Sequence, residues 1–390
     1  MTAWLLPEGF SDALPGEAAS IERLRRLLLD HAAGHGYELV MPPSLEFVES
    51  LLSGTGQDLD LQTFKLVDQA SGRTLGLRAD MTPQAARIDA HLLNREGIVR
   101  LCYCGHVLHT RAQGVYASRE PLQFGAECYG HAGLEADLEV QQMALRSLRL
   151  AGFERLALGL SDVRLVRGVL GGLVAGPGRL SAMLEALSRK DVARLEQLCA
   201  GLPDAQRKPI LALCELFGDA SVLEQARREL PRRAVVLQAL DDMEQLARAH
   251  AEADCAVQID LADLRGYHYH TGVIFGIYAA DRPDALARGG RYDEIGASYG
   301  RSRPATGFSL DLRELVRLSS SAPPRSAVRA EWSAQPGYAR AVRELREQGE
   351  VVVELPPGAA FESDGLRLDR ALSFSQGRWQ VSACEPAGAP

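Results

Sequence analysis

Hydrophobic and polar residues alternate along several short segments of the chain and follow a helical period along others. In LQFGAECYG, residues 122–130, one face of a predicted strand carries Leu122, Phe124, Ala126 and Cys128. The other face carries Gln123, Gly125 and Glu127, since side chains repeat with a period of two. Taken alone, this pattern predicts a strand with one solvent-exposed face. Gly125 nevertheless leaves an open slot between an amide and a carboxylate, which suits a small ligand with hydrogen-bonding groups.

The same two periods predict the other elements. We expect an amphipathic helix over 16–36, a hairpin around Ser71-Gly72, and a helix with Thr82 as N-cap and Pro83 in its first turn. Further strands are expected in VRLCYCGHVLHT, LALGLSD and AVQIDLAD, with a helix over Leu134–Ala151 between two of the strands. Strands with flanking helices indicate an α+β domain with an antiparallel sheet.

The pattern changes twice along the chain. Between about 164 and 250 it is helical, and strands resume at AVQIDLADL and GVIFGIYA, which predicts a helical insertion inside one domain spanning residues 1–318. The stretch SSSAPPRSA, residues 319–327, has the composition of a linker. Residues 328–390 are expected to form a small C-terminal α/β domain or remnant, with a helix near 336–349 and strands at EVVVELP and RWQVSAC.

Composition narrows the class of protein. Hydrophobic residues make up 46% of the chain and charged residues 24%, and the formal net charge of −8 does not favour nucleic-acid binding. Seven cysteines, an odd number, indicate reduced thiols. Cys102 and Cys104 have no second pair at metal-ligand spacing, so we expect no metal site. No signal peptide and no apolar run of about 18 residues is recognisable, so we expect a soluble, cytoplasmic protein.

Four segments carry candidate chemistry. LRADMTPQAAR supplies Asp80 and Thr82 at a helix start, and LQFGAECYG supplies an amide and a carboxylate. LRGYHYHTGVIFGIYA gathers Arg265, Tyr269 and His270 before an apolar strand, and ARGGRYDEIG has paired glycines that allow close backbone approach. Each segment is weak evidence by itself, because aromatic and histidine clusters more often serve core or turn packing.

Together, in this order and over residues 5–316, the segments resemble histidyl-tRNA synthetase, a class II aminoacyl-tRNA synthetase. That family has Leu-Asp-Tyr-Tyr-Thr-Gly where this chain has YHYHTG, and it shares the Gly-Gly-Arg-Tyr-Asp and Gln-x-Gly-x-Glu segments. It has Arg-Pro-Glu-x-Thr where this chain reads RADMT. The resemblance implies an antiparallel sheet flanked by helices, with a helical insertion between the second and third signature motifs.

The resemblance also implies a pocket for free histidine. Its residues would be Asp80, Thr82, Gln123, Glu127, Arg265, Tyr269, His270 and Tyr292. The first three would hold the ammonium group of the amino acid, Glu127 would face the imidazole, Arg265 would reach the carboxylate, and the others would surround the ring. Asp80 is shorter than the glutamate of the family, and His270 replaces a tyrosine.

The nucleotide motifs depart from the family. Counting back from the Gln-x-Gly-x-Glu segment puts His109 at the phosphate-binding arginine and Arg111 at an acidic position, and a one-residue shift does not restore the motif. In GFSLDLREL, Asp311, Arg313 and Glu314 stand where the family has Gly, Glu and Arg. Losing one phosphate-binding arginine costs about 10³–10⁵ in rate, and a glutamate in its place adds repulsion. We therefore expect no amino-acid adenylation.

Such a chain resembles the non-synthetase branch of the family, which serves as regulatory subunit of ATP phosphoribosyltransferase in the first step of histidine biosynthesis. The resemblance implies a non-catalytic subunit without cofactors, a short-form catalytic subunit as partner, histidine as feedback effector, and a homodimer through YELVMPPSLEFVESL within a hetero-oligomer. It implies no nucleic-acid or membrane partner. Three alternatives stay open: a diverged but active synthetase, an RNA-binding paralogue, and a scaffold with an empty pocket.

Overall fold

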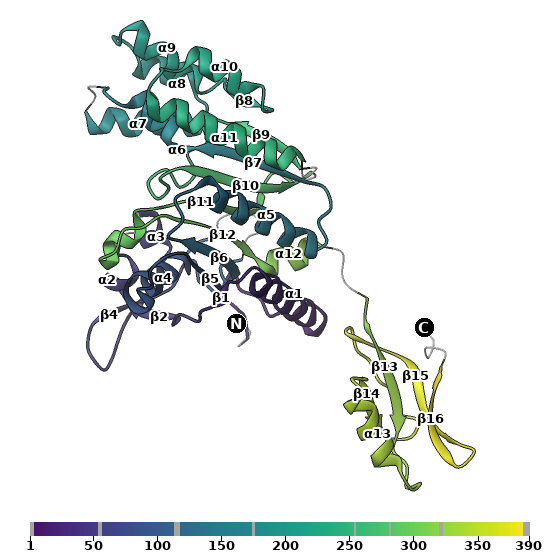
Figure 1. The fold of residues 1–390 in the computed structure, drawn as a ribbon. Helices are drawn as coiled ribbons and strands as arrows, with labels where there is room; N and C mark the ends of the chain where they lie inside the picture. The colour runs from purple at the N-terminus through teal and green to yellow at the C-terminus, as the bar shows by residue number, and fades with distance from the viewer. Residues whose placement is uncertain are drawn as a thin grey trace. The chain divides into compact units, whose positions relative to one another are not determined.

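The chain folds as two compact units. The computed structural model describes residues 4–53, 57–112, 118–173, 176–252, 255–280, 282–319 and 323–384. The larger unit holds the N-terminal residues up to Ser11 together with Leu24–Ser319, and the smaller holds Asp12–Arg23 and Ser320–Pro390. Each unit has its own sheet and helices (Figure 1).

Among the described residues, the larger unit is built on a sheet of nine strands (Figure 1). Their order across the sheet is β1 (Glu38–Leu39), β5 (Val99–His106), β6 (Leu122–Tyr129), β12 (Ala305–Asp311), β11 (Ala285–Arg291), β10 (Val273–Ala279), β7 (Leu156–Asp162), β9 (Ala256–Asp260) and β8 (Phe217–Gly218). In this spatial order, all neighbouring strands from β5 across to β7 pair antiparallel. Strand β1 pairs in parallel with β5, and β9 pairs in parallel with β7. The predicted α+β fold with an antiparallel sheet is confirmed, and parallel pairs lie toward both edges.

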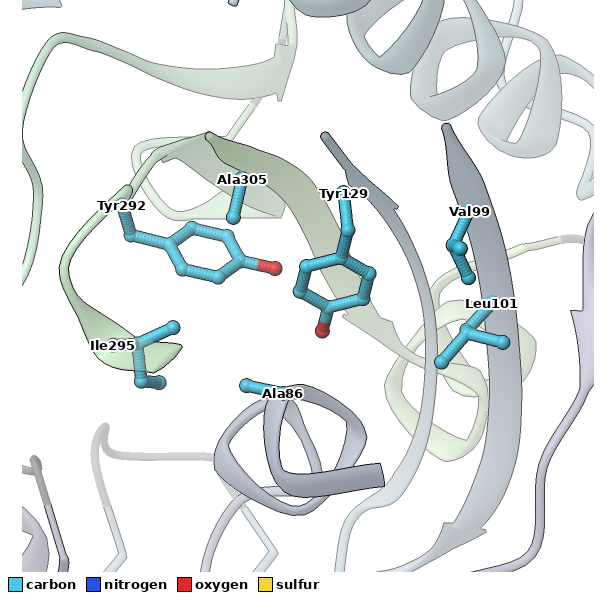
Figure 2. Close-up of a cluster of buried hydrophobic side chains, with 7 residues drawn as sticks. All are labelled: Ala86, Val99, Leu101, Tyr129, Tyr292, Ile295 and Ala305. Carbon is cyan, nitrogen blue, oxygen red and sulfur yellow. The ribbon is translucent and has the colours of Figure 1, made fainter. Parts of the chain in front are cut away.

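Helices cover both faces of the central strands. Helix α5 (Leu134–Leu150) contacts β6, β10, β11 and β12, and α4 (Thr82–Arg87) contacts β6. On the α4 side, Ala86 points toward Tyr129 of β6 and toward Tyr292 (Figure 2). Strand β6 is therefore buried along almost its whole length, Glu127 included. The expectation of one solvent-exposed face was wrong, because a second layer covers that face.

The start of α4 differs from the prediction by one residue. Met81, not Thr82, occupies the N-cap position, and its side chain makes no capping bond. The Asp80 carboxylate accepts a hydrogen bond from the Thr82 backbone N–H at 3.0 Å instead. Asp80 thus supplies the side-chain acceptor that the first turn of a helix needs. The helix continues as a π-helical segment, η1 (Ile88–Leu93).

A small antiparallel sheet lies in the N-terminal part of the larger unit. Its strands, in order, are β2 (Leu45–Phe47), β4 (Thr74–Leu77) and β3 (Lys65–Val67). The predicted hairpin is confirmed, and Gly72 adopts φ +71° in its turn. Helix α2 (Val48–Leu51) contacts β2 and β4. Helix α1 (Pro15–Gly34) precedes this sheet in the chain, and α3 (Gln57–Gln62) lies between α2 and β3 in the chain.

The predicted helical insertion is also confirmed. Its helices are α6 (Val163–Leu170), α7 (Pro177–Ser188), α8 (Val192–Leu198), α9 (Asp204–Ala212), α10 (Val222–Glu229) and α11 (Ala234–Glu252). The first and last of them, α6 and α11, pack against each other. The short strand β8 joins the edge of the large sheet from within this insertion. Two more helical segments, η2 (Ile295–Tyr299) and α12 (Leu312–Leu318), lie later in the larger unit, after the insertion.

The smaller unit contains a sheet of four strands among the described residues. In spatial order these are β14 (Val352–Leu355), β13 (Arg325–Glu331), β15 (Leu366–Ser375) and β16 (Arg378–Ala383), with α13 (Tyr338–Glu347) packed on them. The sequence predicted α13, β14 and β16 but not β13 and β15, where charged residues interrupt the apolar pattern. Strand β13 begins at Arg325, so the predicted linker over 319–327 was too long.

Three further observations concern the described part of the chain. No helix in it is long and apolar enough to cross a membrane. No group of three or more histidine, cysteine or acidic side chains in it is arranged to hold a metal ion. All seven cysteines are free thiols.

Candidate functional site

Glu127 lies in the middle of the large sheet, where its neighbours leave room for a carboxylate. Leu101 of β5 and Gly307 of β12 stand directly opposite it on the two flanking strands. A Cβ atom added to Gly307 would overlap the Glu127 carboxylate, so this position requires a glycine. The side chain of Glu127 is consequently inserted into the layer between sheet and helix, where the residue is only 1% exposed.

Two tyrosine hydroxyl groups satisfy the buried carboxylate. Tyr103 donates a hydrogen bond to one carboxylate oxygen at 2.8 Å, and Tyr292 donates to the other. Burial disfavours the charged form and raises the pKa of Glu127 to about 8, although both hydroxyl bonds act in the opposite direction. A carboxyl group with this pKa exchanges its proton near neutral pH, which is typical of functional sites.

Tyr103 corrects the prediction of an open slot at Gly125. The two residues are register partners on β5 and β6, and the Tyr103 ring fills the space beside the glycine. The Tyr103 hydroxyl also shares a hydrogen bond of 2.9 Å with Thr82 Oγ1. The gap in β6 therefore holds a tyrosine that connects Thr82 to Glu127, and any ligand must bind next to this chain of hydroxyl groups.

Asp80 and Gln123 form a second polar group at the site. Gln123 Nε2 donates to Asp80 Oδ1 at 2.7 Å, and Gln123 Oε1 accepts from the Met81 backbone N–H at 2.9 Å. These two bonds fix the orientation of the amide. Both Asp80 and Gln123 are partly exposed, in contrast to Glu127, so a ligand has access to them.

Aromatic rings form the wall next to Glu127. Tyr269 stacks on Tyr292 with ring centroids 5.1 Å apart, and its buried hydroxyl has no hydrogen-bond partner among the described residues. His270 packs edge-on against Tyr269 at 5.2 Å. Burial lowers the pKa of His270 to about 4, so this ring is neutral at physiological pH. A buried hydroxyl without a partner is costly, so the Tyr269 hydroxyl is a group to which a ligand could donate or from which it could accept a hydrogen bond.

Arg265 is the predicted site residue that the structure keeps apart from the others. Its guanidinium forms a two-pronged ion pair with Asp263, in which Nε lies 2.9 Å from Asp263 Oδ1. It also lies over the Tyr278 ring at 5.7 Å. The structure thus brings together Asp80, Thr82, Gln123, Glu127, Tyr269, His270 and Tyr292, which we call the cradle, and leaves Arg265 outside it.

The residues at the nucleotide motifs have structural contacts of their own. His109 Nε2 lies 2.9 Å from the Ala79 carbonyl oxygen, and Asp311 caps α12 by accepting from the Arg313 backbone N–H at 3.0 Å. The Arg313 guanidinium is buried and donates to the Ser11 carbonyl at 2.6 Å. In contrast, Arg111 and Glu314 are exposed.

Three residues of the site were missed by reasoning from sequence: Tyr103, Asp263 and Gly307. Alternation within VRLCYCGH places Tyr103 on the opposite face from its two neighbouring cysteines, so its side of the sheet was predictable. Its position opposite a glycine depends on strand register, which the sequence does not specify here. Asp263 stands two residues before Arg265, a spacing too common at turns to indicate an ion pair.

This fold and this cradle define a protein of the histidyl-tRNA synthetase type. The family model described as "Histidyl-tRNA synthetase" matches residues 9–315, and the model described as "ATP phosphoribosyltransferase subunit HisZ C-terminal domain" matches residues 325–382. The ATP phosphoribosyltransferase regulatory subunit of Variovorax paradoxus (strain S110) is 55% identical over 386 residues, which cover 98% of this chain and 100% of that protein. The chain belongs to the family of ATP phosphoribosyltransferase regulatory subunits.

Solved structures show the same relationship. The chain is similar to an ATP phosphoribosyltransferase regulatory subunit/histidyl-tRNA synthetase from Bacillus halodurans, with a TM-score of 0.82, 26% identity, and coverage of 94% of this chain and 97% of that one. It shares its fold with a chain of the ATP phosphoribosyl transferase (HisG:HisZ) complex from Thermotoga maritima, with a TM-score of 0.57, 20% identity, and coverage of 74% and 96%.

Proposed function

We propose that the cradle binds free histidine, and that the chain is a non-catalytic subunit that activates a short-form ATP phosphoribosyltransferase catalytic subunit and conveys feedback inhibition by histidine. The observation that carries this proposal is the arrangement around Glu127. A buried carboxyl group, held by two hydroxyls, adjoins an aromatic wall in which the Tyr269 hydroxyl has no partner among the described residues. A partly exposed pair of an acid and an amide lies at the same site. This combination is complementary to a small amino acid with an ionisable ring.

Each part of histidine has a matching group. The ammonium binds at Asp80 and Gln123, because a carboxylate and an amide oxygen accept its hydrogen bonds. The imidazole enters between Glu127 and Tyr269, where a proton can be shared with the carboxyl group. The amino-acid carboxylate pairs with Arg265 once this guanidinium leaves Asp263. Bidentate pairing with a carboxylate is the geometry for which arginine is suited.

Adenylation needs fixed positive charge on the ATP phosphates, and the motifs supply little of it. The second motif has His109, which is engaged with a backbone carbonyl. In the third motif, Arg313 is bonded to Ser11, and Glu314 is an exposed negative charge at the position of an arginine. We infer that the chain retains amino-acid binding without aminoacylation activity.

Regulation then requires a second protein. The Thermotoga maritima complex is described as HisG:HisZ, and by likeness we infer a complex of this chain with a short catalytic subunit in histidine biosynthesis, with a homodimer of this chain inside it and no bound nucleic acid. Histidine must bind one state of this complex more tightly than another. A coupling free energy of about 1–3 kcal/mol gives roughly 5–150-fold inhibition.

Titration calorimetry with histidine tests the cradle. We expect saturable binding to the wild-type chain, and loss of binding in Glu127→Ala and in the closer isostere Glu127→Gln, with both variants checked for cooperative unfolding. Undiminished binding by folded variants would exclude this pocket. Histidine-dependent pyrophosphate exchange by the chain alone would instead establish an active synthetase. Stimulation of the catalytic subunit that histidine reverses would establish regulation.

A further inference from the structure

The loop at residues 264–270 supplies Tyr269 and His270 to the cradle and is bonded to the helical insertion. On its inner side, Tyr269 stacks on Tyr292 at 5.1 Å. The loop turns sharply at Gly266, where φ is +66° and a side chain would collide with the His270 ring. The backbone N–H groups of Tyr269 and His270 both donate to the Gly266 carbonyl at 2.9 Å. The loop is thus a tightly turned unit, and Tyr269 cannot move independently of it.

On its outer side, the loop is bonded to an arginine of the insertion. Arg167 lies on α6, the first helix of the insertion, and its Nη2 donates to the Tyr267 carbonyl at 2.8 Å and to the His270 carbonyl at 2.9 Å. Its guanidinium also lies over the Tyr267 ring at 5.1 Å. These two carbonyl groups bracket Tyr269 in the chain, so Arg167 grips the loop on both sides of the residue that faces the cradle.

Helix α6 is in turn fixed to the last helix of the insertion. Arg164, one turn before Arg167, forms an ion pair of 2.7 Å with Asp242 of α11. Arg233, just before α11, donates to the Gly168 carbonyl at 2.7 Å. Because α6 is attached to α11 near both of its ends, a displacement of α6 is carried to α11 as well.

We propose that Arg167 is the positioning residue through which occupancy of the cradle reaches the helical insertion. This inference rests on the proposed function, in that it takes the cradle to bind histidine. A ligand that engages the free Tyr269 hydroxyl changes the position or the mobility of the loop, and the two carbonyl bonds of Arg167 convey that change to α6. The guanidinium suits this task, since it bonds both carbonyls and stacks on the ring at the same time.

Arg167 is exposed, so its substitution leaves the core intact. The chain also offers a matched control, Arg179, which lies within the insertion and bonds two backbone carbonyls but does not touch the loop. Arg179 Nε donates to the Leu198 carbonyl at 2.7 Å, and Nη2 donates to the Ala200 carbonyl at 3.0 Å. Arg167→Ala and Arg179→Ala therefore remove the same kind of contact at two different places.

Hydrogen exchange of the full chain, with and without histidine, tests the inference. In the wild-type chain, histidine should slow exchange in peptides from the loop and from α6. In Arg167→Ala the loop should remain protected, while the protection of α6 falls by about fivefold or more. Arg167→Lys should retain part of the α6 protection, because both carbonyl bonds come from one nitrogen of Arg167 and an ammonium group can donate to both carbonyls. Arg179→Ala should match the wild type.

The outcomes separate the two proposals. The role of Arg167 would be overturned if Arg167→Ala kept the protection of α6, or if Arg179→Ala lost as much of it as Arg167→Ala does. Histidine binding would stand in both cases. Protection of the loop without protection of α6 in the wild type would do the same. If histidine protects neither segment of the wild type, histidine binding itself is wrong, and the role of Arg167 falls with it.

A second measurement uses the complex with the catalytic subunit. Arg167→Ala should raise the histidine concentration needed for half-inhibition by at least about tenfold, whereas its dissociation constant for histidine changes by no more than about fivefold, the effect of one hydrogen bond. A parallel shift of both quantities would contradict a role in transmission and would reduce Arg167 to a residue that only stabilises the pocket.

Discussion

Gly307 of β12 stands directly opposite Glu127 of β6, and the space that a side chain at residue 307 would fill is occupied by the Glu127 carboxylate. Gly307 has no positive φ, so its requirement for glycine is steric and does not arise from the backbone conformation. Gly307, the first residue of GFSLDLREL, therefore makes room for the Glu127 carboxylate of the cradle.

Gly307→Ala should accordingly expel the carboxylate from its position between the two tyrosine hydroxyls. We expect the free energy of unfolding to fall by about 1–3 kcal/mol, as for an overpacked core, and the affinity for histidine to fall by at least about tenfold. Chemical denaturation and titration calorimetry measure the two effects.

Gly34→Ala is the matched control for this substitution. Gly34 ends α1 and has no positive φ. Outside the backbone of its own helix, no atom of the described residues lies within 4 Å of a Cβ added there. We expect unchanged histidine binding and equal or slightly higher stability. Equal affinity of Gly307→Ala and the wild type for histidine would show that the carboxylate position does not matter to the ligand.

The second prediction concerns the pH dependence of stability. Burial raises the pKa of Glu127 from an ordinary 4.5 to about 8, so the folded chain keeps a proton that the unfolded chain releases. The native state binds more protons than the unfolded state between these two values, and its stability must fall as pH rises through that window. We expect a loss on the order of a few kcal/mol between about pH 5 and pH 8, which levels off above the folded pKa.

Glu127→Gln should remove this part of the pH dependence, because the amide does not titrate. Urea denaturation at a series of pH values measures the slope in both chains. Glu224→Gln, a substitution of an exposed glutamate on α10, should leave the slope as it is in the wild type. An identical slope in Glu127→Gln and the wild type would mean that Glu127 is ionised in the native state.

Local patterns predicted many elements of the larger unit, but they missed the central strands β11 and β12, and they did not predict how the elements meet. The alternation in LQFGAECYG correctly grouped Gln123, Gly125 and Glu127 on one face. It did not reveal that α4 covers this face or that Tyr103 fills the slot at Gly125, because both depend on contacts between segments distant in sequence. Strand register and layer packing are tertiary properties, and one sequence gives little access to them.

The cradle was predictable through resemblance, with Arg265 as the instructive exception. Motif order placed this arginine next to the other ligands, yet its guanidinium pairs with Asp263. In the smaller unit, β13 and β15 were missed because charged residues interrupt the apolar pattern of both strands. Strand β15 is only partly buried along most of its length, whereas Ala327, Val328 and Ala330 of β13 are fully buried.

The third prediction compares two tyrosine hydroxyls that differ in bonding. Tyr103→Phe keeps the ring beside Gly125 but removes the bond to Glu127 and the bond to Thr82, so we expect a loss of about 1–3 kcal/mol in the free energy of unfolding. Tyr269→Phe removes a buried hydroxyl that has no partner among the described residues and is therefore costly, so the free energy of unfolding should equal that of the wild type or exceed it by up to about 1–3 kcal/mol.

The affinity for histidine should also differ between these two variants, for a reason other than their stability. If histidine engages the Tyr269 hydroxyl, Tyr269→Phe weakens its binding by about fivefold or more while leaving the free chain intact. Denaturation and calorimetry on the same preparations give both quantities. A variant Tyr269→Phe that is destabilised yet binds histidine normally would show that this hydroxyl serves the fold and not the ligand.

The last prediction tests whether Asp263 competes with the ligand for Arg265. Asp263→Asn weakens the ion pair but keeps an oxygen that can accept the Arg265 backbone N–H, which now bonds Asp263 Oδ1 at 3.1 Å. If Arg265 has to leave Asp263 to reach the carboxylate of histidine, Asp263→Asn should raise the affinity about two- to fivefold, the range of a partly exposed ion pair. Arg265→Ala should lower the affinity.

Histidinol, which lacks the carboxylate, should bind both variants as it binds the wild type. If Asp263→Asn instead lowers the affinity for histidine as Arg265→Ala does, Asp263 positions the guanidinium for the ligand, and competition between them is excluded.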